Sequence, residues 1–97
     1  MLIKREILEA IKRGEIDLQF RRWTRPSVKA GGTLKSAVGL LRIGRIDDMR
    51  PENVSVADAR RAGFRDLDDF RRWLGTMKEG RLFQRIEVSY LGNVPKP

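Results

Sequence analysis

The sequence predicts an α+β fold: a small mixed β-barrel with an N-terminal helix and two short helices packed outside it. Residues 15–23 and 81–91 alternate apolar and polar side chains with strand period, whereas three other stretches space their apolar residues as helices do. Strands separated so irregularly favour a barrel over a parallel βαβ sheet. A chain of 97 residues fits one domain, 1–97, with a core of about 2–91 and a frayed C-terminal tail.

Three helices are expected. The first covers 2–14, where isoleucines recur every four residues, and it ends at Gly14. The second begins at Ser55, which forms a capping box with Asp58, and it ends at Gly63 in a left-handed conformation. The third follows directly, with Asp66 or Asp68 near its N-terminus. Its apolar stripe consists of Leu67, Phe70 and Leu74.

The middle of the chain is expected to be extended. Residues 24–32 form a loop that is punctuated by proline and glycine. Residues 33–49 then form one long strand whose apolar side chains do not keep a single face. We therefore expect Gly39 or Gly44 to mark a β-bulge or a bend of the barrel.

The charge balance points to an anionic partner. The chain has 21 Lys and Arg residues against 13 Asp and Glu residues, a formal net charge of +8. Neutralisation of phosphate groups gives a basic domain sequence-independent affinity for nucleic acid. The sequence therefore predicts a nucleic-acid-binding protein.

Two residue types are absent from the sequence, which contains neither histidine nor cysteine. Their absence removes thiolate metal sites and every Ser-His or Cys-His nucleophile pair. The one carboxylate cluster, Asp47, Asp48 and Glu52, is explained more simply as a polar strand end than as the metal site of a nuclease. We expect no catalytic residue, no metal and no cofactor.

The N-terminus does not have the pattern of a signal peptide, because charges interrupt it before an apolar core forms. No apolar run approaches the roughly 20 residues of a membrane span. A soluble, cytoplasmic protein that does not bind membranes is expected.

Three motifs resemble a known family. Gly14 and Arg21 have the spacing of the strand pattern G-x-K-T-x-T-x-R, and PSVKAGGTL resembles P-x-V-x-x-G-D-x-L. The most specific match is VSVADARRAGFRDLDDF with I-T-x-E-D-A-x-x-E-G-F-x-S-x-E-E-F. On these motifs the chain, from about Leu2 to Leu91, resembles the ASCH domains of the PUA-like superfamily. The resemblance implies a small β-barrel and a ligand related to RNA.

The same resemblance argues against one kind of chemistry. Some ASCH proteins are amidohydrolases that act on acetylated cytidine through a lysine, a threonine and a glutamate. The corresponding positions hold Ile16, Gln19 and Ala62. None of these side chains supplies an activated nucleophile.

The expected binding site extends from the first strand into the loop and the long strand. Arg21 matches the strand-end arginine of the family, as a ligand contact or as the partner of Asp47 or Asp58. Trp23 either stacks on a base, which contributes about 1–3 kcal/mol, or packs in the core. The predicted nucleic-acid-binding residues are Arg21, Arg22, Trp23, Arg25, Lys29, Lys35, Arg42 and Arg45.

The first hypothesis is a nucleic-acid-binding module with RNA as the partner and DNA as the alternative. PUA-like barrels are suited to structured or modified RNA, whose shape and splayed bases are read. The second hypothesis is a small hydrolase, either a ribonuclease or an eraser of a nucleoside modification. The third is an adaptor whose basic face docks an acidic protein.

Overall fold

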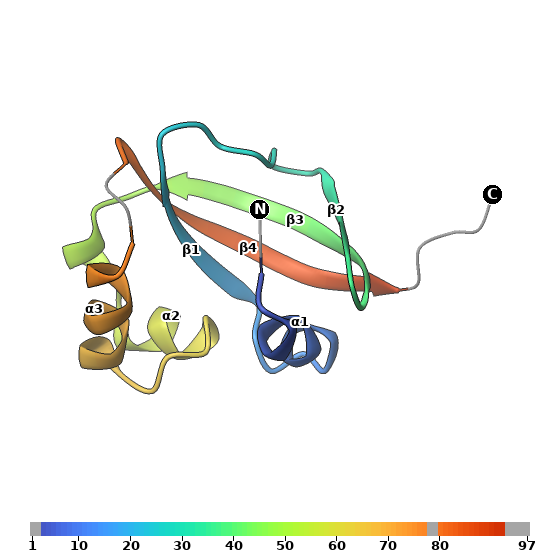
Figure 1. Cartoon of the computed structure of the whole chain (residues 1–97), viewed down its shortest axis with the longest axis horizontal. Helices are drawn as coiled ribbons and strands as arrows, with labels where there is room; N and C mark the ends of the chain where they lie inside the picture. The colour runs from blue at the N-terminus through green and yellow to red at the C-terminus, as the bar shows by residue number, and fades with distance from the viewer. Residues whose placement is uncertain (1–2, 78–79, 93–97) are drawn as a thin grey trace.

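The computed structural model describes residues 3–77 and 80–92, so the tail that was expected to fray, 93–97, lies outside the described part. The elements follow one another as α1 (Arg5–Lys12), β1 (Leu18–Trp23), β2 (Thr33–Ser36), β3 (Gly39–Asp48), a 3-10 turn (Pro51–Asn53), α2 (Val56–Arg61), α3 (Leu67–Gly75) and β4 (Leu82–Gly92) (Figure 1).

The four strands form one curled sheet in the order β1-β4-β3-β2, which makes a half-barrel. The predicted α+β class and barrel-like curvature are confirmed. The prediction of a mixed sheet is wrong, because β1–β4, β4–β3 and β3–β2 all pair antiparallel. In the described residues β1 and β2 are the two edges, since four strands curl without closing a barrel.

The single long strand expected over 33–49 is a hairpin. A turn at 37–38 separates β2 from β3, and the Ser36 hydroxyl donates to the Gly39 carbonyl at 2.6 Å. Gly39 has a φ of +130°, and a Cβ there would lie 2.5 Å from the carbonyl oxygen of Gly92, so only glycine fits. Gly44 falls in the register shift between Ile43 and Ile46, as expected for a bulge.

The sheet has a different core on each face. The inner face packs against α1, and its buried side chains are Leu8, Ile11, Leu41, Ile43, Ile86 and Val88. The outer face packs against α2 and α3, and its buried side chains are Leu18, Phe20, Ala59, Phe70 and Phe83. The prediction that all helices lie outside holds for α2 and α3 but not for α1, because the open half-barrel needs a helix to cover its inner face.

Local capping confirms the predicted starts of α2 and α3, whereas α1, predicted over 2–14, covers only Arg5–Lys12. The Ser55 hydroxyl accepts from the Asp58 N–H at 3.1 Å, and the Asp66 carboxylate accepts from the Asp69 N–H at 2.8 Å. Gly63, with a φ of +98°, ends α2 in the left-handed region. These short helices turn residues 62–64 toward β1. Among the described residues, no helix has the length and apolar character needed to cross a membrane.

Candidate nucleic-acid interface and adjoining pocket

The positive charge is concentrated in one part of the chain. Residues 18–46 hold seven Lys and Arg residues and no Asp or Glu, whereas the other Lys and Arg residues nearly balance the 13 acidic ones. This segment, which we call the acid-free segment, comprises β1, the loop 24–32, β2 and most of β3. Almost the whole net charge of +8 therefore belongs to one continuous stretch of the chain.

Strand alternation places two of the predicted cations on the outer face of β2 and β3. Leu34 and Leu41 are paired neighbours that contact the inner core. The side chains of Lys35 and Arg42 therefore lie on the opposite face, and both are exposed. Arg42 stands across from Ser89 of β4, so no acidic residue is its direct strand neighbour.

The loop between β1 and β2 is fixed against β3 by backbone hydrogen bonds. The Gly31 N–H donates to the Ile43 carbonyl, and the Ile43 N–H donates to the Gly32 carbonyl, both at 2.9 Å. The loop crosses from β1 to β2, and its last residues lie beside β3 (Figure 1). Its predicted cations, Arg25 and Lys29, are exposed. These bonds bring the end of the loop that holds Lys29 to the same strand pair as Lys35 and Arg42, whereas Arg25 lies near the end of β1.

Three of the other predicted residues lie in more constrained positions. Arg45 is exposed, but its guanidinium pairs with Asp47 at 2.8 Å. Arg22 and Trp23 are partly buried, and Trp23 packs against the inner core. The Trp23 indole N–H donates to Oε1 of Gln84 at 2.7 Å. A stacking role for this ring stays a prediction.

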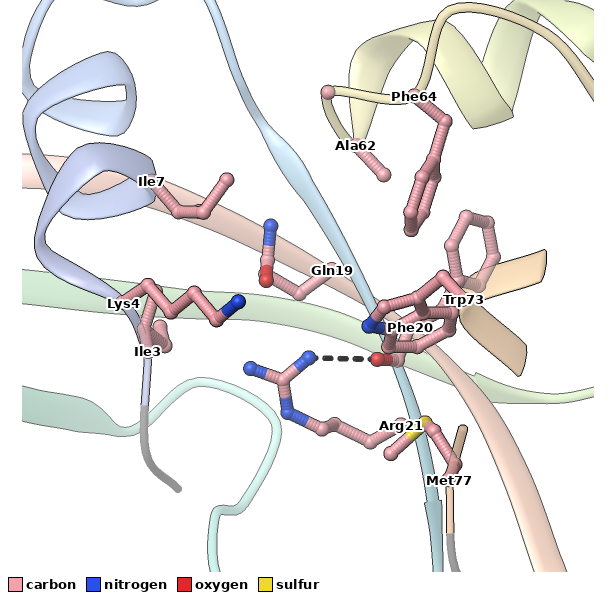
Figure 2. A pocket seen from close by; sticks show the side chains of 11 residues that line it. Ile3, Lys4, Ile7, Gln19, Phe20, Arg21, Ala62, Phe64, Trp73 and Met77 are labelled. Atoms are coloured by element: carbon pink, nitrogen blue, oxygen red, sulfur yellow. Dashed lines mark hydrogen bonds between the residues drawn. The ribbon is translucent and has the colours of Figure 1, made fainter. Parts of the chain in front are cut away.

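The eighth predicted residue, Arg21, lines a pocket of about 320 Å³ on the side of β1 away from β4 (Figure 2). The N-terminal residues before and within α1 form one wall of this pocket, and the segment from α2 to α3 forms another. Arg21 was predicted as a ligand contact or an ion-pair partner, whereas the residues that form the other walls were not predicted to line a site. The lining residues used below are Lys4, Gln19, Arg21, Phe64 and Trp73.

The polar side chains gather at one end of the pocket. Lys4 and Arg21 point into it from different elements, with Gln19 beside them (Figure 2). Arg21 Nη1 donates to the Phe20 carbonyl and Gln19 Nε2 donates to the Leu18 carbonyl, both at 2.7 Å. These bonds orient the two side chains along the strand edge. Burial lowers the pKa of Arg21, but an arginine remains protonated at neutral pH.

Aromatic rings form the other end of the pocket. The ring centroids of Phe64 and Trp73 are 5.1 Å apart, and the centroids of Phe64 and Phe70 are 5.5 Å apart. Such tilted and edge-on arrangements are the favoured geometries of aromatic pairs. Trp73 is partly buried and lies both against the outer core and on the pocket wall.

Two carboxylates considered as partners of Arg21 bind another arginine. Asp58 pairs with Arg85 at 2.8 Å, and Asp47 lies 3.9 Å from the Arg85 guanidinium. Asp58 also contacts Arg61, which holds Asp17 at 2.8 Å. Within 3–77 and 80–92 no group of three acidic side chains is placed to hold a metal ion.

The positions that the ASCH resemblance associates with catalysis divide between the pocket and the core. Gln19 and Ala62 line the pocket together with Arg21. Ile16 is buried in the inner core, where its Cδ1 would lie 2.7 Å from a Cβ on Gly63. The two positions in the pocket carry an amide and a methyl group, and neither is a nucleophile.

Comparison of the chain with protein-family models, with curated proteins and with solved structures gave no match. The ASCH and PUA-like assignment is therefore a proposal that rests on the sequence motifs.

Proposed function

We propose that the protein is a nucleic-acid-binding module that prefers RNA, and that the acid-free segment is its binding surface. The observation that carries this proposal is the charge segregation: seven cations and no acid within residues 18–46, on a chain that is otherwise nearly neutral. Release of counterions from phosphates makes such a surface a source of affinity. Because the segment contains no carboxylate, none of its own side chains repels the phosphates.

Four exposed cations are the proposed phosphate contacts: Arg25, Lys29, Lys35 and Arg42. Their side chains come from the loop and from β2 and β3, which backbone hydrogen bonds hold together. Arg45 contributes less because Asp47 already neutralises it. Arg22 and Trp23 lie where β1 leads into the loop, so they mark the end of the proposed surface nearest to the pocket.

The form of the segment favours RNA over a DNA duplex. Base readout in the DNA major groove requires a helix or a two-stranded ribbon that enters the groove. The acid-free segment contains no helix, and its ribbon β2–β3 is held in the sheet by β4. Single-stranded or irregular RNA presents splayed bases and phosphates to a curved surface of this kind. The resemblance to the ASCH domains supports the same partner.

Fluorescence anisotropy tests the proposal with labelled single-stranded RNA, single-stranded DNA and duplex DNA. Salt is raised from about 50 to about 200 mM, and the logarithm of the affinity should fall linearly with the logarithm of the salt concentration. The double variant Lys35→Ala/Arg42→Ala should weaken binding and reduce the salt slope by about 2, since each lost phosphate contact removes about 1.

The matched control removes two exposed cations from the helices, Arg60→Ala/Arg72→Ala, and leaves the acid-free segment intact. This variant has the same net charge as the double variant of the strands. It should retain the wild-type salt slope. Equal losses in the two variants would show that net charge alone drives binding. Absence of salt-dependent binding by the wild type would refute the nucleic-acid proposal and favour an adaptor.

A further inference from the structure

Two carboxylates lie at the end of the acid-free segment. Asp47 is the first acidic residue after the segment, and Glu87 lies on β4 beside the same part of β3. Asp47 binds the Arg45 guanidinium at 2.8 Å, and the Glu87 carboxylate accepts the Arg45 backbone N–H at 3.3 Å. Acidic groups therefore hold the last cation of the segment at both its side chain and its backbone.

A β-bulge places Arg45 beside these carboxylates. The register between β3 and β4 shifts at this point, and a Cβ on Gly44 would lie 3.2 Å from the Cβ of Glu87. Bulges re-aim the side chains at their position. The Arg45 side chain is 75% exposed, so an anion from solution can reach its guanidinium while Asp47 still holds it.

Asp47 has a second cation besides Arg45. Its other carboxylate oxygen lies 3.9 Å from the guanidinium of Arg85, which also binds Asp58 and Glu87. The pair between Arg45 and Asp47 is largely exposed, and such pairs contribute little to stability. Removal of the Asp47 charge should therefore change the fold little, whereas it releases the Arg45 guanidinium.

Arg45 continues the series of proposed phosphate contacts along β3. Arg42 lies three residues earlier on the same strand, and Lys35 lies on β2 beside it. A free guanidinium at position 45 could bind a phosphate through two parallel N–H donors. With Asp47 charged, one carboxylate already occupies those donors, so the series ends at Arg42.

We propose that Asp47 determines where the RNA-binding surface ends, by masking Arg45 as a phosphate contact. Asp47 competes with a phosphodiester of the bound strand for the same guanidinium, and it does not itself touch the RNA. The inference rests on the proposed function, because the competing phosphate belongs to the RNA of that function.

The salt titration with labelled single-stranded RNA tests the masking when it is repeated on Asp47→Asn. This variant should steepen the slope of log affinity against log salt by about 1, because one phosphate contact is gained. Its affinity at about 50 mM salt should rise about tenfold. Arg45→Ala alone should keep the wild-type slope, because the contact is masked already. Asp47→Asn/Arg45→Ala should return to the wild-type slope.

Two control variants change the net charge by the same amount as Asp47→Asn. Glu87→Gln removes a carboxylate beside the same arginine, but its amide oxygen can still accept the Arg45 N–H and Asp47 still holds the guanidinium. Asp68→Asn releases Arg71 on α3, outside the acid-free segment. Both variants should keep the wild-type slope. A steeper slope in either of them would show that charge in general governs binding and would overturn the masking.

Binding by the wild type distinguishes this inference from the proposed function. Salt-dependent binding with the same slope in Asp47→Asn overturns the masking and leaves the proposed function intact. A slope that stays steep in Asp47→Asn/Arg45→Ala, or a slope that falls in Arg45→Ala alone, also overturns it. Absence of salt-dependent binding in the wild type and in every variant refutes both. Melting temperatures, followed by circular dichroism, should be close to the wild-type value in all variants.

Discussion

The indole N–H of Trp23 donates to the side-chain oxygen of Gln84 at 2.7 Å, from an edge strand to its central neighbour. Gln84 is 8% exposed, and its Nε2 donates in turn to Asp48 of β3 at 2.7 Å. The chain of contacts links three strands through side chains alone. Because the amide is almost completely buried, each of its hydrogen bonds replaces water that it has lost.

Replacing Trp23 with Phe should keep an aromatic ring but leave the buried oxygen of Gln84 without this donor. We expect a loss of about 1–3 kcal/mol in the free energy of unfolding, which urea denaturation followed by circular dichroism measures. Trp23→Ala should cost about 3 kcal/mol or more because packing against the inner core is also lost. If Trp23→Phe unfolds at the wild-type urea concentration, the hydrogen bond contributes nothing to stability.

Arg85 should be the most important charged residue for stability. Its guanidinium is 2.8 Å from Asp58, 3.5 Å from Glu87 and 3.9 Å from Asp47, and its side chain is 17% exposed. Arg85→Met would leave these carboxylates together without their common cation. We expect a loss of about 1–3 kcal/mol in the free energy of unfolding, reduced from the fully buried case by partial solvent exposure.

The control for Arg85 is Arg71→Met, which breaks an exposed pair with Asp68 at 3.5 Å. Such a pair contributes at most about 0.5 kcal/mol. The hydrogen bond to Asp58 is the main cause that raises the pKa of Arg85. Its stabilisation is therefore complete below the ordinary arginine pKa and is lost only as the pH rises through the raised value. The difference between wild type and Arg85→Met should persist across neutral pH.

Arg21 should behave in the opposite way. Burial lowers its pKa, so the folded state disfavours the charged form and stability would recover only as the pH rises past the lowered value. At neutral pH the desolvation of the charged guanidinium therefore opposes folding. Arg21→Met should have an unfolding free energy within about 1 kcal/mol of wild type, or above it.

The stability difference produced by Arg21→Met should be constant from about pH 5 to about pH 9, since arginine does not titrate there. Strong destabilisation would show instead that the guanidinium stabilises the fold, and Arg21 would no longer be a candidate ligand contact.

The protein should not deacetylate acetylated cytidine. Amide hydrolysis requires an activated nucleophile and a group that passes protons to the leaving amine. Gln19 and Ala62 line the pocket without either function, and Ile16 is buried in the inner core. Incubation with the modified nucleoside, followed by chromatography, should show no cytidine. Turnover above about 1 per second, an ordinary enzymatic rate, would mean that other residues perform the chemistry.

Features fixed by neighbouring residues could be predicted from the sequence. The caps at Ser55 and Asp66, the left-handed Gly63 and the bulge at Gly44 all follow from the residue at the position itself or a few residues away. The hairpin turn at 37–38 was missed because alanine and valine are poor turn formers. Only the glycine after them, Gly39, indicated the reversal.

Features that depend on distant contacts could not be predicted. The apolar stripe of α1 shows that the helix packs, but not that it packs on the inner face of the sheet. The pocket joins Lys4, Arg21 and Trp73, which are far apart in sequence. The burial of Gln19 is such a feature: the sequence shows a polar residue between Leu18 and Phe20, but only the structure shows that its amide is buried and hydrogen-bonded.

The place of β4 in the sheet has a consequence for synthesis on the ribosome. β4 pairs with both β1 and β3, yet it follows them in the chain. Leu18 and Ile43 therefore cannot pair with Glu87 and Val88 until those β4 residues have been synthesised. Until β4 leaves the exit tunnel, the nascent chain can form its helices and the β2–β3 hairpin but cannot join β1 to them. A chain that stops before Leu82 would expose both cores to quality control and degradation.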